Sequence, residues 1–268
     1  MKKQVQFYTI NTLTNLHAGS GETNFGVIDN LVQKDVNTHL PTIHSSSLKG
    51  ALKEYFNEHD QSVLEVFGDD TKAGSWQFLS ADLLSRPVRS DNAPYFNATL
   101  PVILQILVKK IEQLGLKPPK ELIGLSNLTV EKNKPQVLIQ GYENAIIEEL
   151  DWKTVKVEGA TLELVSDWIT AVLGEKIVLI NSDDFTELLL PVIARNHLEK
   201  GESKNLWYEE IVPYDSRFIT AIVQVTQDDN EELVTSFNKG LEGFVQIGAN
   251  ASIGYGISKL TPLALERP

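Results

Sequence analysis

Residues 4–29 read QVQFYTINTLTNLHAGSGETNFGVID, and within this stretch a strand-like pattern gives way to a glycine-rich loop. From Gln4 to Leu13 the side chains alternate with the two-residue period of a strand, so that Phe7 and Tyr8 face opposite sides. The three glycines that follow interrupt any regular pattern. The stretch therefore predicts a first strand that enters a loop.

A helix and a strand–helix pair are expected next. Ser45–Asn57 carries apolar residues at helical spacing behind serines that can cap a helix start. Gly74–Leu84 reads as one strand. Tyr95–Gly115 reads as a strand that passes at Thr99 into a helix, with Pro101 in its first turn and the final glycine as its stop.

The second half of the chain begins irregularly and becomes regular again. Lys117–Gly159, rich in Pro, Asn, Lys and Glu, is interpreted as an insertion lobe, and a hairpin is expected around the turn-like EKGESK, Glu199–Lys204. The other elements expected are helices at Thr161–Gly174, Ser182–Leu189 and Asn230–Gly243, and strands at Arg217–Thr226 and Gly243–Gly248. Because each end supplies a strand, a helix and a glycine loop, the pattern predicts an α+β sheet with helices on one face.

Composition narrows the class of protein. The 268 residues, 42% of them hydrophobic, suit a packed globular protein, and no apolar run approaches the length of a bilayer span. Because the N-terminus alternates like a strand where a signal peptide would be apolar, we expect a soluble cytoplasmic protein. The absence of cysteine excludes a disulfide framework, a thiolate metal site and a cysteine nucleophile.

The net charge of −12 argues against a nucleic-acid partner, because such proteins usually carry a basic surface. The acidic residues are unevenly placed, however, since one stretch with only Lys153 and Lys156 as bases carries Glu143, Glu148, Glu149, Asp151, Glu158 and Glu163. Local fields decide binding, so the sum over the whole chain does not exclude a basic surface elsewhere.

Two glycine or serine segments have both a functional and a structural interpretation. IGANASIGYG, Ile247–Gly256, has the composition of a phosphate-binding loop but lies near the C-terminus, where the dinucleotide fingerprint does not belong, so a tight glycine turn is the alternative. HSSSLKG, His44–Gly50, offers backbone amides and Lys49 to an anion, although ordinary helix capping explains it equally well.

A group of titratable side chains lies in or beside the first loop. Such a density suggests acid, base or metal chemistry, whereas solvated loop histidines are the structural alternative, and the helical i, i+4 spacing of a zinc site is missing. The members are His17, Glu22, Asp29, Asp35, His39 and His44.

Four segments, taken in order, resemble the RAMP superfamily, and within it the backbone subunits of type III-B (Cmr) CRISPR effector complexes. The first, Leu16–Phe56, has a His-x-Gly-Ser-Gly loop, a turn similar to the family's Gly-Val-Asp, and a Ser-Ser-Leu-Lys-Gly helix start. The others are FGDDTKAGSWQFLSADLLSRPVRS, IARNHLEKGESKNLWYEEIVP and FVQIGANASIGYGISKL. The chain departs from the family pattern at Ala249, where a glycine is usual, and at Lys34 and Asp35, where Arg and Glu are common.

The resemblance implies a modified ferredoxin-like (RRM-like) palm with an insertion lobe and a long thumb hairpin. The palm would span 1–116 and 214–268, the lobe about 117–190 and the thumb about 191–213. Copies would stack head to tail into an open filament along a CRISPR guide RNA, together with other Cmr subunits. The thumb would intrude between guide and target strands.

The same resemblance implies guide-directed cleavage of single-stranded target RNA at about six-nucleotide intervals. Asp29 is the implied catalytic residue and the ligand of a divalent cation, Mg²⁺ or Mn²⁺, with His17, Glu209 and Glu210 as further catalytic candidates. RNA contacts are expected from Gly19, Ser20, Gly21, Lys34, Ser46, Ser47, Lys49, Lys53, Arg86, Arg89, Gly248, Asn250, Ser252 and Gly254.

Two rival interpretations stay open at this point. In the first, the chain is a purely structural subunit that binds guide RNA, and Asp29 only caps a turn. In the second, the chain is a small-molecule enzyme that uses both glycine loops for a nucleotide, which would require a closed pocket near Gly248.

Overall fold

The computed structural model describes residues 2–21, 26–59, 61–226 and 231–267 and divides the chain into two compact units. The palm unit comprises 1–83, 190–214 and 218–263. The insert unit comprises 84–189, 215–217 and 264–268. The predicted α+β class is confirmed, since both units combine helices with strands.

The palm unit has the strand and helix order of a ferredoxin-like fold. Four strands and two helices follow the pattern βαββαβ, and they are β1 (Lys2–Thr12), α1 (Ser45–His59), β3 (Trp76–Phe78), β13 (Arg217–Thr226), α7 (Glu231–Gly240) and β15 (Ile257–Leu263). The sheet order is β15-β1-β13-β3, so the last strand pairs with the first and the third lies beside the second, as that fold requires. Shorter elements complete the unit: β2 (Thr42–Ile43), η1 (Gln61–Val66), β14 (Val245–Gln246) and η2 (Ala251–Ile253).

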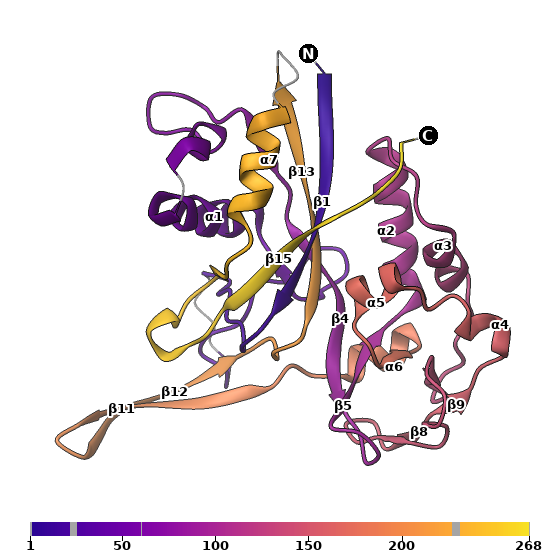
Figure 1. Ribbon diagram of the computed structural model, residues 1–268. Helices are drawn as coiled ribbons and strands as arrows, with labels where there is room; N and C mark the ends of the chain where they lie inside the picture. Colours follow the sequence, from indigo (N-terminus) through magenta and orange to yellow (C-terminus); the bar gives the residue numbers. More distant parts are fainter. Residues whose placement is uncertain (1, 22–25, 60, 227–230, 268) are drawn as a thin grey trace. The chain divides into compact units, whose positions relative to one another are not determined.

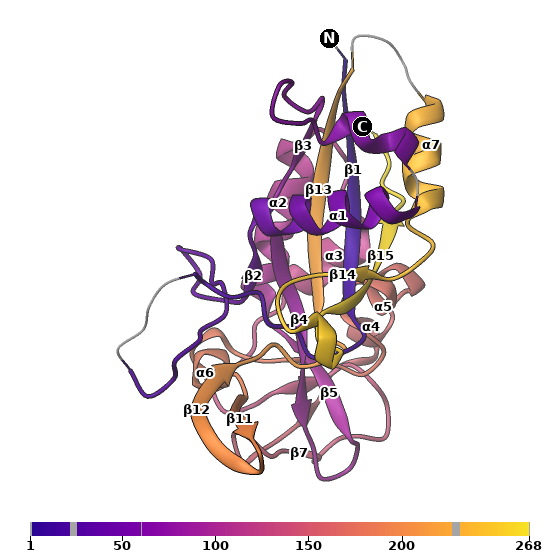
Figure 2. The same ribbon diagram turned by 90° about the vertical axis from the view of Figure 1, so that its left-hand side faces the viewer.

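The palm core lies between this sheet and its two helices. Both helices cover the same face, with α1 lying across β1 and β13 (Figure 2). Apolar residues of α1 recur at helical spacing, and Leu48, Leu52 and Phe56 are fully buried. Phe237 of α7 packs its ring 4.8 Å from Phe56 and joins the helices.

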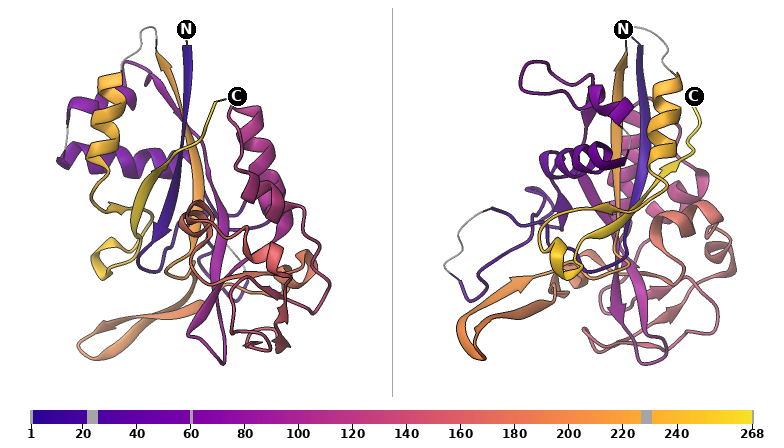
Figure 3. Two further views of the ribbon diagram at one scale, coloured as in Figure 1. Left: turned by 45° about the vertical axis from the view of Figure 1, so that its right-hand side comes forward. Right: turned by 60° about the vertical axis from the view of Figure 1, so that its left-hand side comes forward.

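A long hairpin extends from the rest of the palm unit (Figures 1 and 3). Its strands are β11 (Val192–Glu199) and β12 (Glu202–Glu210), joined by Lys200 and Gly201. Both turn residues have positive φ, 51° and 84°, which matches the twist of a tight two-residue hairpin turn. The thumb predicted at about 191–213 is thus present as a hairpin.

The insert unit packs helices beside a mixed set of strands. Its strand order is β4-β5-β10-β6-β9, where β4 pairs antiparallel with β5, and β5 parallel with β10. These strands are β4 (Ala81–Arg89, in this unit from Leu84), β5 (Tyr95–Thr99), β10 (Ile177–Leu179), β6 (Gln136–Val137) and β9 (Val155–Lys156), with β7 (Ile146–Ile147) and β8 (Trp152–Lys153) as a separate pair. Its helices are α2 (Pro101–Gln113), α3 (Lys120–Ser126), α4 (Gly159–Leu162), α5 (Asp167–Leu173) and α6 (Ser182–Glu187).

Three predicted elements differ from the structure. Gly74–Leu84 is two strands, β3 and β4, and Thr161–Gly174 is two helices because Ser166 caps a new start by accepting a hydrogen bond from the Ile169 amide. The closing strand predicted at Gly243–Gly248 is only the two-residue β14.

The unit boundaries also differ from the predicted domain division, since 84–116 groups with the insertion lobe and the hairpin with the palm. Among the helices of the described residues, none is long and apolar enough to cross a membrane.

Candidate active site at the base of the hairpin

Asp29 is an exposed residue of the first loop and is hydrogen-bonded to Tyr208 of β12, near the base of the hairpin. Its amide donates to the Tyr208 carbonyl at 3.1 Å, and the Tyr208 amide donates to Asp29 Oδ2 at 2.8 Å. The next residue continues the contact, because the Asn30 carbonyl accepts from the Glu210 amide at 2.9 Å. These backbone bonds hold an exposed carboxylate at a defined place on β12.

Glu209 joins the first loop, the hairpin and the segment Ile247–Gly256, called here the C-terminal glycine segment. Its Oε1 accepts from Trp207 Nε1 at 2.9 Å and from the side-chain amide of Asn30 at 3.3 Å. Its Oε2 accepts from Arg195 Nε at 2.8 Å and from the side-chain amide of Asn250 at 3.0 Å. The residue is 5% exposed, so this carboxylate is occupied by protein donors.

The environment of Glu209 keeps its carboxylate ionised. Burial opposes the charge, but hydrogen bonds from Trp207 and Arg195, together with the charges of Arg195 and His17, outweigh it and hold the pKa of Glu209 below its ordinary value. A carboxylate whose pKa is lowered and whose oxygens are both occupied by donors is a weak base and is poorly suited to take a proton from RNA. The predicted catalytic role of Glu209 therefore receives no support from its surroundings.

Glu210 is likewise engaged by the first loop. Its Oε1 forms an ion pair with Lys34 at 2.9 Å, and its Oε2 accepts from the Val32 amide at 3.2 Å. Lys34 is thus partly neutralised, with 37% of its side chain exposed. The side chains of both consecutive glutamates therefore bind the first loop, Glu209 through Asn30 and Glu210 through Val32 and Lys34.

His17 is buried beneath the loop, at 5% exposure, with ring Nδ1 2.7 Å from the Glu210 carbonyl oxygen. Because a carbonyl only accepts, Nδ1 carries a proton, and Nε2 is the ring nitrogen left for another partner. A Cβ at Gly19 would stand 3.3 Å from Nε2. Glycine at this position therefore leaves room beside the imidazole.

The C-terminal glycine segment contacts the backbone of His17. The Ala249 amide donates to the His17 carbonyl at 2.9 Å. Gly248, with φ of +80°, approaches so closely that a Cβ there would meet the same carbonyl oxygen at 2.5 Å. The left-handed positions are Gly248 and Asn250, which flank Ala249, so the methyl group of Ala249 is accommodated.

The comparisons with known proteins decide the family. A model of the RAMP superfamily matches residues 9–259. The chain belongs to the RAMP superfamily. The CRISPR system Cmr endoribonuclease Cmr4 of Pyrococcus furiosus is 30% identical over 278 residues, covering 93% of this chain and 92% of that protein. The CRISPR system CMR subunit Cmr4 of Saccharolobus solfataricus is 23% identical, with 96% of each chain covered.

Solved structures agree with this RAMP fold. A chain of a type III-B Cmr-beta complex bound to cognate target RNA superposes with a TM-score of 0.79 at 24% identity, covering 97% of both chains. Oligomeric Cmr4 from Pyrococcus furiosus gives a TM-score of 0.72 at 23% identity, covering 97% of this chain and 98% of that one. The 30% identity over nearly both full lengths places this RAMP protein with the Cmr4 proteins.

The remaining loop and helix residues expected to bind RNA fall into two groups in this RAMP palm. Some are hydrogen-bonded within the protein, and others are exposed. Gly19 and Ser20 line the first loop, where the Gly19 carbonyl accepts from the Gln33 side chain and the Ser20 amide donates to Leu31. Ser47 accepts from the same Gln33 side chain at 2.9 Å. The exposed positions are Gly21, Ser46, Ser252 and Gly254.

Four of the basic residues expected to contact RNA are divided between the units, with Lys49 and Lys53 in the palm unit and Arg86 and Arg89 in the insert unit. Lys49 and Lys53 lie half-buried on α1, and Lys53 Nζ donates to the Gly68 carbonyl at 2.8 Å. Arg86 is only 4% exposed, and its guanidinium donates to the Leu188 and Leu189 carbonyls. This burial argues against the predicted phosphate contact of Arg86, because its donors are directed into the insert unit.

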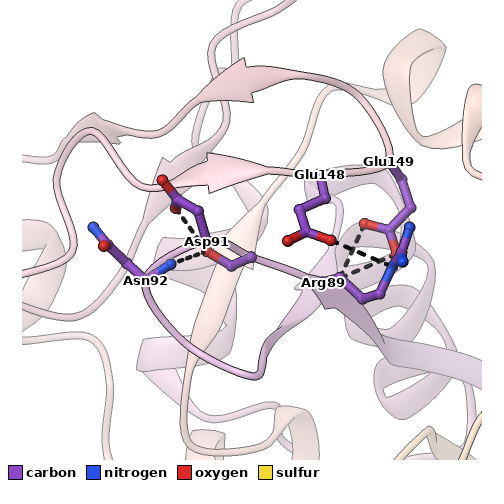
Figure 4. A network of polar contacts seen from close by, with 6 residues as sticks. Arg89, Asp91, Asn92, Glu148 and Glu149 are labelled. Carbon is purple, nitrogen blue, oxygen red and sulfur yellow. Dashed lines mark hydrogen bonds and ion pairs between the residues drawn. The ribbon is translucent and has the colours of Figure 1, made fainter.

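Arg89 is exposed, but acidic partners surround it (Figure 4). Its Nε lies 3.3 Å from Glu149 Oε1 and 3.7 Å from Glu148 Oε2. Its backbone amide also donates to both oxygens of Glu149. A phosphate would have to compete with two carboxylates here, which weakens the expectation that Arg89 contacts RNA.

The other described titratable residues of the first loop do not assemble into a protein-borne metal site. Asp35 accepts from the amides of Asn37 and Thr38 and so closes a local turn. Glu22 lies outside the described residues. Among the described residues, no three His, Asp or Glu side chains are grouped so that they could hold a metal ion.

Two surface pockets of about 360 and 380 Å³ lie in the insert unit. One is lined by Tyr95, Asn97 and Asp215 and the other by Lys117–Glu121, and neither lining includes Gly248. The nucleotide-enzyme alternative therefore gains no support from these pockets.

Residue-by-residue reading of the sequence missed Arg195, Trp207 and Asn30. Register alone could have grouped the first two with Glu209, because Arg195 pairs with Trp207, and Ile193 with Glu209, across the hairpin. The bonds to Asn30 and Asn250 span long stretches of chain, and no local pattern in the sequence signals them.

Proposed function

We propose that this chain is a repeated backbone subunit of a type III-B CRISPR ribonucleoprotein, which binds guide RNA and cuts complementary single-stranded target RNA at about six-nucleotide intervals. The observation that carries the proposal is the exposed Asp29 carboxylate, fixed by its backbone and Oδ2 to the base of a projecting hairpin. The 30% identity to a protein named Cmr endoribonuclease supports it. Such a subunit would act in the cytoplasm.

Cleavage in this proposal uses the ribose 2′-hydroxyl of the target as nucleophile. The hydroxyl oxygen attacks the adjacent phosphorus and its proton passes to a base. The bond to the 5′-oxygen of the next nucleotide breaks, that oxygen takes a proton from water, and a 2′,3′-cyclic phosphate remains. A splayed backbone beside a displaced nucleotide aligns these atoms, so the protein has little chemistry left to perform. Asp29 supplies the exposed carboxylate at that point, either as base or as cation ligand.

His17 and the two glutamates hold the site in this proposal. The His17 ring donates from Nδ1 to the Glu210 carbonyl, so it connects the loop to β12. Glu210 pairs with Lys34, and Glu209 is filled by four donors. We assign all three to positioning Asp29, and the opening beside Gly19 gives RNA access to the loop backbone.

A divalent cation, Mg²⁺ or Mn²⁺, belongs to the proposal as a cofactor bound jointly with RNA. Asp29 would hold it, and one protein carboxylate completed by phosphate oxygens and water is a usual arrangement for Mg²⁺. When bound, the cation neutralises charge on the phosphate that is attacked. The single exposed carboxylate fits this shared site and not a site built by protein alone.

The non-catalytic filament subunit is the second candidate. The bond from the Tyr208 amide to Asp29 Oδ2 favours it, because this bond is what a purely structural carboxylate would make. In both candidates the partners are guide RNA, target RNA, further copies of this chain and other Cmr subunits.

Mapping the ends of cut target separates the two candidates. We expect the assembled complex, supplied with Mg²⁺ and a matching target, to release fragments that differ by about six nucleotides and end in cyclic phosphates. A target lacking complementarity to the guide serves as the control and should stay intact. An uncut matching target, or cuts without regular spacing, would contradict the proposed activity.

Removing divalent cations should stop cleavage without releasing RNA. Chelation with EDTA is expected to abolish fragments while gel-shift binding of target is retained, because Asp29 offers only one carboxylate and the phosphate charge then stays unneutralised. Adding excess Mg²⁺ back should restore the original rate. Undiminished cutting in EDTA would show that Asp29 acts without a metal.

A further inference from the structure

The hairpin face that meets the first loop carries an ion pair between the half-buried Arg195 and the buried Glu209. Their side chains are 16% and 7% exposed, and Arg195 Nε lies 2.8 Å from Glu209 Oε2. The two residues are diagonal neighbours on one face of the hairpin, since Ile193 is the direct partner of Glu209. The pair therefore ties β11 to β12 at the end of the hairpin nearest the palm sheet.

The partners of this pair come from two other parts of the palm unit, the C-terminal glycine segment and the first loop. The Arg195 guanidinium lies over the Tyr255 ring at 4.4 Å, while Asn250 donates to Glu209. Tyr255 and Asn250 belong to the C-terminal glycine segment, and Asn30, which also donates to Glu209, follows Asp29 directly. One carboxylate thus fixes the hairpin, the glycine segment and the neighbour of Asp29 to each other.

Separating Arg195 from Glu209 would cost electrostatic free energy. A buried carboxylate without a cationic partner is costly, and removing one partner leaves the other uncompensated. Without Arg195 the Glu209 side chain would have to move toward water and release Asn30 and Asn250. Because Asn30 follows Asp29 directly, its release would let Asp29 shift, and a displacement near 1 Å can cost about a hundredfold in rate.

We propose that Arg195 is a positioning residue for target cleavage, acting through Glu209 to hold Asp29 at the scissile phosphate. This inference rests on the proposed nuclease function. Arg195 needs no contact with the reacting atoms in this role. Its effect should consequently fall on the cleavage step and on the choice of phosphate, while the affinity for RNA stays nearly unchanged.

The test compares Arg195→Gln, Arg195→Lys and the exposed control Lys259→Gln in assembled complexes, by single-turnover cleavage, target affinity and mapping of cut ends. For Arg195→Gln we expect cleavage at least about tenfold slower, with cuts spread to neighbouring phosphates and target affinity within about threefold of the unsubstituted complex. Arg195→Lys keeps the charge and should recover most of the rate and precision. Lys259→Gln should match the unsubstituted complex.

Three results would overturn the proposal. They are an unchanged rate in Arg195→Gln, a lysine variant no better than glutamine, or an equal loss of affinity and cleavage. If Arg195→Gln fails to assemble, Asn30→Ala, which removes the bond from Glu209 to the neighbour of Asp29 and leaves the ion pair, must slow cleavage with affinity retained, and an unchanged rate there would reject the inference. Failure of the proposed function itself is distinct, because the unsubstituted complex would then leave the target uncut.

Discussion

Asp29→Asn is expected to slow target cleavage by at least about a hundredfold while leaving guide and target binding intact. Asparagine has nearly the same shape, and its side-chain oxygen can still accept from the Tyr208 amide, so the link that holds the loop to β12 is preserved. What the substitution removes is the negative charge needed to take a proton or hold a cation. The measurement is single-turnover cleavage in the assembled complex with Mg²⁺, alongside target affinity.

This substitution discriminates between the two candidate functions. If Asp29 only capped a turn, asparagine would cap it equally well and the rate would not change. Asp70→Asn is the matched control, because Asp70 is an exposed aspartate of the same palm unit and should cleave normally when substituted. Full activity in Asp29→Asn would therefore reject the catalytic assignment.

The strands and helices of the palm could be predicted from sequence because their signals are local, whereas the ferredoxin-like palm was implied by the family resemblance. Alternation in β1, helical spacing in α1 and the strand–helix–strand order at the C-terminal end each follow from neighbouring residues. The α+β class and the thumb hairpin follow in the same way. Ser166 shows the limit, since an apolar pattern continued past it while its hydroxyl was able to start a new helix.

The candidate site was only partly predictable. Asp29 and His17 lie in one recognisable segment, but their geometry depends on Glu209, Arg195 and Asn250, which are far away along the chain. The expected RNA contact of Arg86 was based on its charge alone. A sequence cannot show that its guanidinium is buried against backbone carbonyls. Long-range hydrogen bonds and burial are properties of the folded chain.

Gly248→Ala is expected to lower the free energy of unfolding by about 3 kcal/mol, which combines a strained left-handed backbone with an overpacked contact. The residue has φ of +80°, and its new Cβ would lie 2.5 Å from the His17 carbonyl oxygen, which cannot move without breaking its bond to the Ala249 amide. Because His17 also links the loop to Glu210, cleavage should fall by at least about tenfold. Urea unfolding and single-turnover cleavage measure the two effects.

Gly115→Ala is the matched control, and it separates backbone strain from crowding. Gly115 has almost the same backbone angle, φ of +77°, but a Cβ there would meet no heavy atom within 4 Å. Its substitution should cost only about 1 kcal/mol, the strain of a left-handed alanine, and leave cleavage nearly unchanged. Equal effects of the two substitutions would mean that the close approach to His17 contributes nothing, and that the C-terminal glycine segment does not support the site.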